Sequence, residues 1–597
     1  MEGQLHRVDV TVLPLFLRPA LEIALPPASE VAGNWSPALS PDGRHAAYVS
    51  DRGGTPAVWV QPVGSELAFQ IAFAEPVTSV AWSSGGGWLA CQITPGGAPR
   101  HEVWLVRPDG SDLHQVAGFG TDTADNVRWL PGRPVLALTE NLTEAVLIDV
   151  ATGTRTVVAS AELISLCDVD PAGRSALLRH GPRGARWIVL RDLSSGLEET
   201  LTRGEEAIFS PGGGCVYARG EDGEFPALIR VAGASTEVLA GADTEIESFA
   251  VTADGRTAAV LRNVRGGESL LELLDLDHNA SPGAGRTTTV PLPGPVVAGL
   301  TWSFDGSTLA FTAEGPGQPP GVWACDRDGS NLRAISAEPA AADAVFPTLE
   351  EFSAHDGLTL TGWLFSPPGA GPHPTVVWLH GGPEAQERPG HEPLFQSLVR
   401  RGIAVLAPNV RGSSGFGHTF VNADNVGLRW NAVEDVRSCV RHLRDTGIAG
   451  RVGVMGRSYG GYLTLAALCA YPELFDVGID VCGMSDFATF YQHTEPWIAA
   501  AAISKYGDPE VDGELLRELS PIHRIDRLRA PLMVVHGEND TNVPVIEAEQ
   551  VVAALAARGA PHRYLLFAGE GHELLHRSSR AEYLRETIAW LTTHLLP

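Results

Sequence analysis

The chain has 597 residues, of which 44% are hydrophobic and 19% are charged, so it is too long for one small binding module and too apolar for a disordered protein. Its 71 acidic residues outnumber its 43 basic residues, and the formal charge of −28 would repel phosphate backbones and anionic membrane surfaces. We therefore expect at least two globular domains, with no nucleic-acid partner and no membrane role.

The cysteines and the N-terminal stretch bear on the cellular compartment. The seven cysteines are odd in number, lie far apart and form no C-x-x-C pair, so neither a disulfide framework nor a zinc ribbon is indicated. The apolar stretch from Val8 to Leu25 is interrupted by charged residues and prolines, which is unlike a signal-peptide core or a membrane span. We expect a cytoplasmic protein in which residues 1–28 form an N-terminal extension.

Residues 29–342 contain a loose internal repeat. Apolar runs alternate with seven turns centred on Gly43, Gly86, Gly132, Gly173, Gly213, Gly255 and Gly306. Short apolar runs between turn residues are typical of strands, and a period of roughly 40 to 45 residues is typical of propeller blades. The pattern predicts a β-propeller with seven blades over 29–342, the alternative being a β-sandwich with coincidental turns.

Residues 343–597 have a different texture, because strand and helix patterns alternate. Strands are predicted at 375–379, 404–407, 452–455, 532–536 and 564–567, and helices at 430–445 and 459–470. This order predicts a doubly wound sheet with helices on both faces, as in an α/β-hydrolase domain.

A nucleophile motif lies where one of these strands ends and a helix begins. The segment 456–460 reads G-R-S-Y-G and matches G-x-S-x-G, which places Ser458 on a tight turn. Asp540 and His572 each follow a later strand, in the chain order that such hydrolases use. We predict that Ser458 attacks, that His572 transfers the proton and that Asp540 orients the imidazole.

The developing oxyanion of an acyl-transfer reaction needs two donors. The segment His380-Gly381-Gly382-Pro383 follows the strand at 375–379, so the backbone N–H groups of Gly382 and Tyr459 are the predicted donors. Residues 572–576 also match the zinc-protease pattern H-E-x-x-H, but that interpretation leaves Ser458 and Asp540 unexplained. We expect neither a metal nor a cofactor.

Several segments together resemble the prolyl oligopeptidase family of serine peptidases, especially its acylaminoacyl-peptidase and aminopeptidase branch. They are HGGP (380–383), NVRGSSGFG (409–417), GRSYGGY (456–462), DTNVP (540–544) and GEGHE (569–573). The resemblance implies a propeller that admits only short or unstructured peptides to the active site. One stretch departs from the family, because the Gly-Asp-Trp-Gly of many members reads VGLRW at 426–430.

The same resemblance implies candidate substrate-binding residues. Asn542 occupies a position where relatives contact a backbone carbonyl of the bound peptide, and Trp497 lies in the segment 482–506 that lines their specificity pocket. Glu384 and Glu495 are candidates to hold a substrate α-amino group, which would make the protein an aminopeptidase.

Three functions are therefore open at this point. The leading hypothesis is a serine peptidase that hydrolyses short peptides through an acyl-enzyme, of the aminopeptidase or acylaminoacyl-peptidase type. The second is an esterase or amidase acting on a small non-peptide substrate with the same triad, because one site chemistry serves many acyl substrates. The third is a propeller interaction protein with an inert hydrolase domain. Family members range from monomers to larger assemblies, so a homo-oligomer is compatible with the resemblance.

Overall fold

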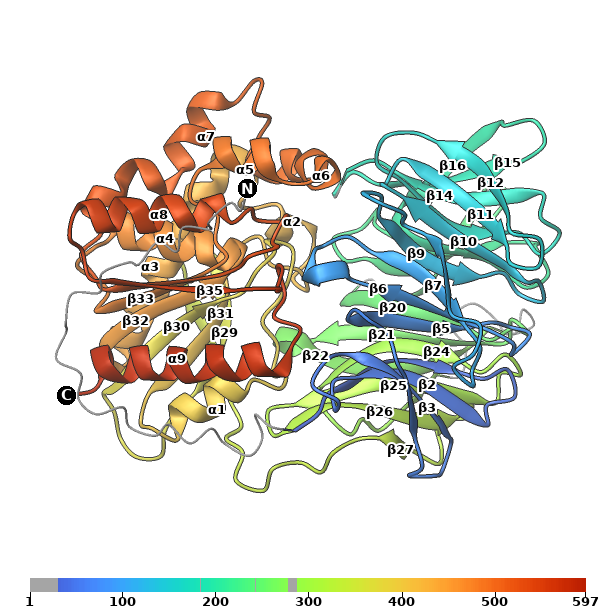
Figure 1. Ribbon diagram of the computed structural model, residues 1–597, viewed down its shortest axis with the longest axis horizontal. Coiled ribbons are helices and arrows are strands. Elements are labelled where there is room, and N and C mark those ends of the chain that lie inside the picture. The colour runs from blue at the N-terminus through green and yellow to red at the C-terminus, as the bar shows by residue number, and fades with distance from the viewer. Residues whose placement is uncertain (1–30, 183, 242, 277–286) are drawn as a thin grey trace, which may run out of the picture.

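The computed structural model describes residues 31–182, 184–241, 243–276 and 287–597. An all-β part and a part with mixed helices and strands lie side by side (Figure 1). The predicted N-terminal extension, residues 1–28, lies outside the described residues.

The all-β part consists of antiparallel sheets arranged one after another along the chain. The first three sheets contain β1 (Asn34–Leu39), β2 (His45–Ser50), β3 (Ala57–Pro62) and β4 (Phe69–Ile71); β5 (Val77–Trp82), β6 (Leu89–Ile93), β7 (Glu102–Val106) and β8 (His114–Ala117); and β9 (Ala124–Trp129), β10 (Val135–Glu140), β11 (Glu144–Asp149) and β12 (Thr154–Ser160). The next sheet contains β13 (Ile164–Val169), β14 (Ser175–His180), β15 (Trp187–Asp192), β16 (Glu198–Phe209), β17 (Val216–Gly220), β18 (Ala227–Ala232) and β19 (Ser235–Ala240). The last two contain β20 (Glu245–Val251), β21 (Thr257–Val264), β22 (Glu268–Asp275) and β23 (Thr287–Thr289); and β24 (Val296–Trp302), β25 (Thr308–Gly315), β26 (Gln318–Asp326) and β27 (Arg333–Ser336).

The predicted turns join the first two strands of each repeat. Between β1 and β2, for example, Ser40 donates a 2.7 Å hydrogen bond to Asp42, and the N–H of Gly43 donates to the Ser40 carbonyl at 2.9 Å. Apolar side chains then pack between neighbouring sheets, as Leu105 and Leu136 do from β7 and β10. This stacking of short twisted sheets confirms the predicted β-propeller.

The predicted number of seven separate blades is not confirmed. Across the described residues the propeller has five four-stranded sheets and one seven-stranded sheet. The larger sheet is continuous because β16 is 12 residues long, pairing with β15 through Glu198–Arg203 and with β17 through Gly204–Phe209. The chain therefore passes through this region without the turn that separates the other sheets.

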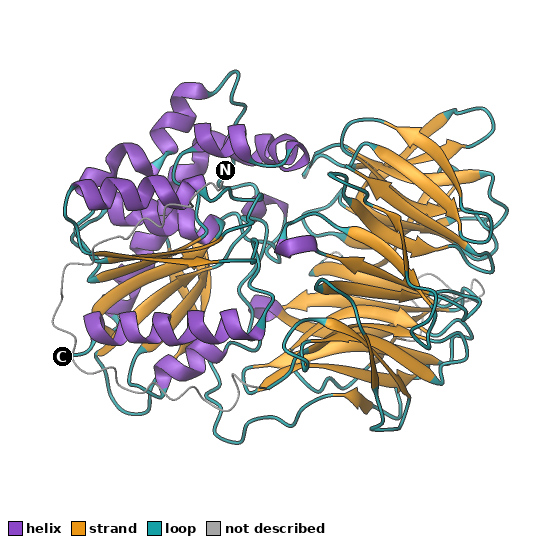
Figure 2. Ribbon diagram, in the orientation of Figure 1, coloured by secondary structure: helices purple, strands orange, loops and turns teal. Residues whose placement is uncertain are grey.

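The second part contains one eight-stranded sheet, confirming the predicted α/β-hydrolase domain (Figure 2). Its spatial order is β28-β29-β31-β30-β32-β33-β34-β35, and pairing is parallel from β31 onward. The strands are β28 (Thr348–Ser353), β29 (Thr359–Phe365), β30 (His373–Leu379), β31 (Ala404–Asn409), β32 (Ala449–Arg457), β33 (Val477–Val481), β34 (Leu532–Gly537) and β35 (His562–Phe567). The propeller strand β27 ends at Ser336 and β28 begins at Thr348, while the exact boundary at 342/343 stays a prediction.

Helices cover both faces of this sheet (Figure 1). Val436 of α3, Leu463 of α4 and Val551 of α8 belong to the core on one face, and Leu398 of α1 and Ile588 of α9 to the core on the other. The helices are α1 (Pro393–Val399), α2 (His418–Val421), α3 (Arg429–Asp445), α4 (Tyr459–Ala470), α5 (Phe487–His493), α6 (Pro496–Tyr506), α7 (Gly513–Leu519), α8 (Ile546–Ala557) and α9 (Arg577–Leu595). In the part of the chain that is described, no helix has the length and apolar character needed to cross a membrane.

Candidate active site

Ser458 lies on a tight turn between β32 and α4, with φ 57° and ψ −119°. A positive φ is strained for a residue with a side chain, and such strain is characteristic of functional positions. The turn is possible because Gly460 has no β-carbon, which would overlap the carbonyl oxygen of Leu379. The side chain of Ser458 is thereby held at the edge where the parallel strands end.

The three residues predicted as a triad come together at this edge. Nε2 of His572 lies 3.1 Å from Oγ of Ser458, and Nδ1 of His572 lies 2.7 Å from Oδ2 of Asp540. The other oxygen of Asp540 accepts hydrogen bonds of 2.9 Å from the N–H groups of Asn542 and Val543. The arrangement provides a hydroxyl, a base within hydrogen-bond reach and a carboxylate that orients the base.

The pKa values of His572 and Asp540 depend on their burial and on the charge that each side chain presents to the other. Burial opposes the charged imidazole, but the nearby negative charge of Asp540 outweighs it and raises the pKa of His572. Burial likewise opposes the ionised form of Asp540, yet the His572 interaction holds the pKa of this carboxyl below its usual range. Asp540 therefore remains ionised and stabilises the imidazolium that a proton transfer would create.

A second buried imidazole lies behind the carboxylate. Nε2 of His536, at the end of β34, donates to the carbonyl of Val543 at 2.8 Å and lies 3.5 Å from Oδ2 of Asp540. Burial lowers the pKa of His536, and its hydrogen bond to the Val543 carbonyl holds the loop that follows Asp540. Sequence reasoning missed His536, although its place at a strand end beside Asp540 was a usable signal.

The predicted oxyanion donors lie beside the serine. A β-carbon on Gly381 would lie 3.9 Å from Oγ of Ser458, so the HGGP loop passes close to the hydroxyl. Among the residues described, neither the N–H of Gly382 nor that of Tyr459 has a hydrogen-bond acceptor. Both donors are therefore available to a developing oxyanion.

The ring of Tyr459 is fixed by a buried ionic network that sequence reasoning did not anticipate. Its hydroxyl donates to Asp424 at 2.8 Å and accepts from the guanidinium of Arg429 at 2.8 Å, while Arg429 also forms an ion pair with Asp424. Arg429 is completely buried and comes from the stretch that departs from the family pattern. This departure therefore supports the residue that follows the serine.

The four predicted substrate-binding residues occupy different surroundings. Glu495 accepts a 2.8 Å hydrogen bond from Thr541 and lies with Trp497 on a 390 Å³ cavity that faces propeller loops. Glu384 lines a separate cavity and forms an ion pair with Lys505. Asn542 uses its backbone in the Asp540 turn, and its carbonyl accepts from Thr494 at 2.8 Å. Their roles in binding substrate stay predictions.

The cavity around Glu384 is strongly acidic. It has a volume of 360 Å³ and lies between the propeller and the hydrolase loops that carry Glu384, Ser414 and His418. Its charged lining residues are Glu205, Glu221, Glu245, Glu247, Glu384, Arg186 and Arg219. Burial and the neighbouring charge of Glu205 raise the pKa of Glu221 to about 7. Four of these acids come from the propeller, where the sequence offered no motif to single them out.

One group of side chains has the composition of a metal site. Cys482, Asp540 and His572 offer ligand atoms that all lie within 4.8 Å of one another. His576, the second histidine of the H-E-x-x-H pattern, instead pairs with Glu570 at 3.0 Å. The two histidines of that pattern thus have different partners.

The chain is similar to several known proteins. Residues 392–596 match the model of the prolyl oligopeptidase family. A dipeptidyl aminopeptidase BIII from Pseudoxanthomonas mexicana is 27% identical over 583 residues, which cover 89% of this chain and 83% of that protein. An acylamino-acid-releasing enzyme from Rattus norvegicus is 29% identical over 238 residues, 38% of this chain and 32% of that one. The crystal structure of a puromycin hydrolase superposes with a TM-score of 0.81 and 19% identity, covering 95% of each chain.

Proposed function

We propose that the protein is a serine aminopeptidase that releases N-terminal residues from short peptides, and the match of residues 392–596 to the prolyl oligopeptidase family supports this proposal. The observation that carries the choice of a free amino terminus is the acidic cavity beside the HGGP loop. The matched dipeptidyl aminopeptidase, whose alignment covers most of both chains, supports the same choice.

In the proposed mechanism Ser458 attacks the scissile carbonyl while His572 takes its proton. Asp540 keeps the imidazole in the required tautomer and stabilises its charged form, and the N–H groups of Gly382 and Tyr459 receive the oxyanion. His572 then returns the proton to the leaving amine, which leaves the acyl group on Ser458. Water, activated by the same imidazole, releases the acyl group and restores the enzyme.

The acidic cavity favours an ammonium group over an N-acyl group. Five glutamates and two arginines line it, and Glu221 and Glu245 share one partner, Arg219, at 3.6 Å and 3.8 Å. The other three glutamates each have a basic partner of their own: Arg186 for Glu205, Arg388 for Glu247 and Lys505 for Glu384. Burial and the neighbouring charge of Glu205 raise the pKa of Glu221. A substrate ammonium would relieve the repulsion, whereas an acetylated terminus carries no charge to offer. Glu384 joins this cavity to the loop that carries the proposed oxyanion donor Gly382.

The proposal also includes the number of propeller blades and the cellular location. We count seven blades by treating β13–β16 and β16–β19 as two blades that share one strand, because β16 pairs with different neighbours in its two halves. We also place the protein in the cytoplasm, on the basis of its dispersed and odd-numbered cysteines.

The test uses p-nitroanilides of one or two residues, each with a free and with an acetylated amino terminus. We expect the wild type to prefer the free amine, Ser458→Ala to be inactive, and Glu221→Gln to lose most of the preference. Glu66→Gln, a change at an exposed propeller residue, should behave as wild type. Preference for the acetylated substrate would instead identify an acylaminoacyl-peptidase.

If no anilide is cleaved although a fluorophosphonate labels Ser458, the esterase or amidase hypothesis takes the lead. Biological activity that survives Ser458→Ala would favour the interaction protein. Both results would contradict the aminopeptidase proposal.

A further inference from the structure

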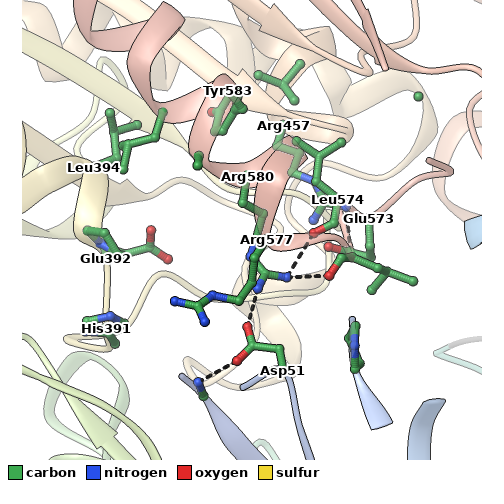
Figure 3. Close-up of a pocket in the computed structure, with 18 of the residues that line it drawn as sticks. Asp51, His391, Glu392, Leu394, Arg457, Glu573, Leu574, Arg577, Arg580 and Tyr583 are labelled. Atoms are coloured by element: carbon green, nitrogen blue, oxygen red, sulfur yellow. Dashed lines mark hydrogen bonds and ion pairs between the residues drawn. The ribbon is translucent and has the colours of Figure 1, made fainter. Parts of the chain in front are cut away.

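A second cavity, of 520 Å³, lies between the propeller and the part of the hydrolase domain that carries His572 (Figure 3). The propeller contributes Trp35, Asp51 and Pro320 to its wall, and the hydrolase domain contributes Arg457, His572 and the start of α9. This cavity adjoins the triad at His572, and it is distinct from the acidic cavity around Glu384.

The charged groups in this wall fall into two classes. Arg580 pairs with Asp51 and Arg457 pairs with Glu573 at 2.5 Å, so these positive charges are already compensated. Arg577 is different, because its guanidinium has no hydrogen bond or ion pair with any described residue. Figure 3 shows the side chain of Arg577 extending across the cavity toward the side where Glu392 lies.

Resting on the function proposed above, we infer that this cavity receives the leaving half of the peptide and that Arg577 binds its C-terminal carboxylate. The location follows from the chemistry of acyl transfer. When the tetrahedral intermediate formed by attack of Ser458 collapses, its C–N bond breaks, the acyl group stays on Oγ of Ser458 and His572 gives its proton to the departing nitrogen. The departing chain therefore begins beside His572, which lines the cavity together with the residue that precedes Ser458.

The chemistry of the cavity selects a carboxylate. A guanidinium offers a planar pair of donors that matches a carboxylate, and such bonds are stronger where water is partly excluded. The side chain of Glu392 likewise has no hydrogen bond or ion pair with the residues that the structure describes. It does not oppose an anion at neutral pH, because burial and the charge of Glu314 raise its pKa to about 8. A volume of 520 Å³ is in the range of sites that hold small ligands, so it fits the end of a short peptide.

A peptide would thus be recognised at both ends, with its ammonium group in the acidic cavity and its carboxylate on Arg577. This arrangement assigns the enzyme a preference for short peptides with two free termini. It also supplies a reason for that preference beyond steric exclusion by the propeller.

The experiment compares tri- to pentapeptides made as free acids and as C-terminal amides. For the wild type we expect kcat/KM to be about tenfold higher for the acid than for the matched amide, mainly through a lower KM. In Arg577→Gln the ratio of acid to amide should fall to about one. The ratio is taken within each variant, so a general loss of folded enzyme cancels. Arg585→Gln, an exposed arginine further along α9, should keep the wild-type ratio.

Binding to Ser458→Ala, measured by calorimetry with the same peptides, tests the inference independently of turnover. Equal affinity for acid and amide, or a preference that survives in the double variant Ser458→Ala with Arg577→Gln, would overturn it. A wild type that cleaves p-nitroanilides but treats acids and amides alike contradicts this inference alone. Failure to cleave any free-amine substrate contradicts the proposed function.

Discussion

Gly97 of the propeller and Gly571 of the hydrolase domain lie backbone against backbone, so closely that a β-carbon on Gly571 would overlap the carbonyl oxygen of Gly97. The neighbouring Gly96 carbonyl accepts a 2.8 Å hydrogen bond from the side chain of Asn539. One propeller turn, Pro95–Gly97, therefore contacts both loops that carry Asp540 and His572. The propeller supports the catalytic loops directly, in addition to any filtering of substrates.

Gly571→Ala should lower kcat by about 100-fold, because the added methyl group must displace either the propeller turn or the adjacent His572, and a shift of about 1 Å in a catalytic group has an effect of that size. Steady-state kinetics on one anilide would measure the loss. Gly513→Ala is the control, since its methyl group would meet nothing within 4 Å. A Gly571→Ala enzyme with wild-type kcat would show that the contact does not position His572.

Asp540→Asn should lower kcat by roughly 10⁴-fold, the size of effect seen when the orienting carboxylate of such a triad is neutralised. The direction in which the pH profile of kcat shifts follows from the ion pair between Asp540 and His572. Asp540 raises the pKa of His572, so removing its charge lowers that pKa and moves the acidic limb of the kcat profile to lower pH. The profile of each variant between pH 5 and pH 9 is the measurement. Asp526→Asn, at an exposed position, should leave the limb in place, and an unshifted limb in Asp540→Asn would contradict the assignment.

Glu221 should make the recognition of a free amine dependent on pH near neutrality. Because its pKa is raised to about 7, the acidic cavity gains negative charge as pH rises from about 5 to about 7, while the substrate amine, whose pKa is about 8, stays largely protonated. We expect kcat/KM for the free-amine substrate, divided by that for its acetylated partner, to rise several-fold over this interval. Dividing the two kcat/KM values cancels the effect of His572 ionisation, because this ionisation affects both substrates equally. In Glu221→Gln the ratio should stay flat, and a rise that persists there would assign the dependence to another group.

Arg429→Leu should destabilise the hydrolase domain by about 3 to 5 kcal/mol, because the change leaves the carboxylate of Asp424 buried without its ionic partner. Denaturant unfolding followed by tryptophan fluorescence would measure the difference. Arg585→Leu, which removes an exposed arginine, provides the comparison. Equal stability of the two variants would show that Tyr459 and neighbouring groups compensate the buried charge.

Much of the site could be predicted because its members follow local rules. Ser458, Asp540 and His572 lie one, three and five residues after the ends of β32, β34 and β35, and the carboxyl ends of neighbouring parallel strands meet at one edge of the sheet. Gly382 follows β30 in the same way. Short-range pattern and chain order are therefore enough to indicate which residues will lie together there.

The propeller shows the opposite case. Each of its turns could be recognised from the local sequence, and these turns were enough to predict a β-propeller. Whether two repeats separate into distinct sheets depends on the path of β16, and the pairing of its two halves with β15 and β17 is a tertiary property.

The sequence by itself thus determined the order of the two domains, the nucleophile turn and the identity of the two strand-end partners of Ser458, because these depend on neighbours within a few residues. Only the tertiary structure decided which charges line the two cavities between the propeller and the hydrolase domain. Glu221 and Glu384 are 163 residues apart, Asp51 and Arg580 are 529 residues apart, and neither pair shares a motif. They meet because the propeller packs against the carboxyl edge of the hydrolase sheet, and burial at that contact gives the carboxyl groups of Glu221 and Glu392 their raised pKa values.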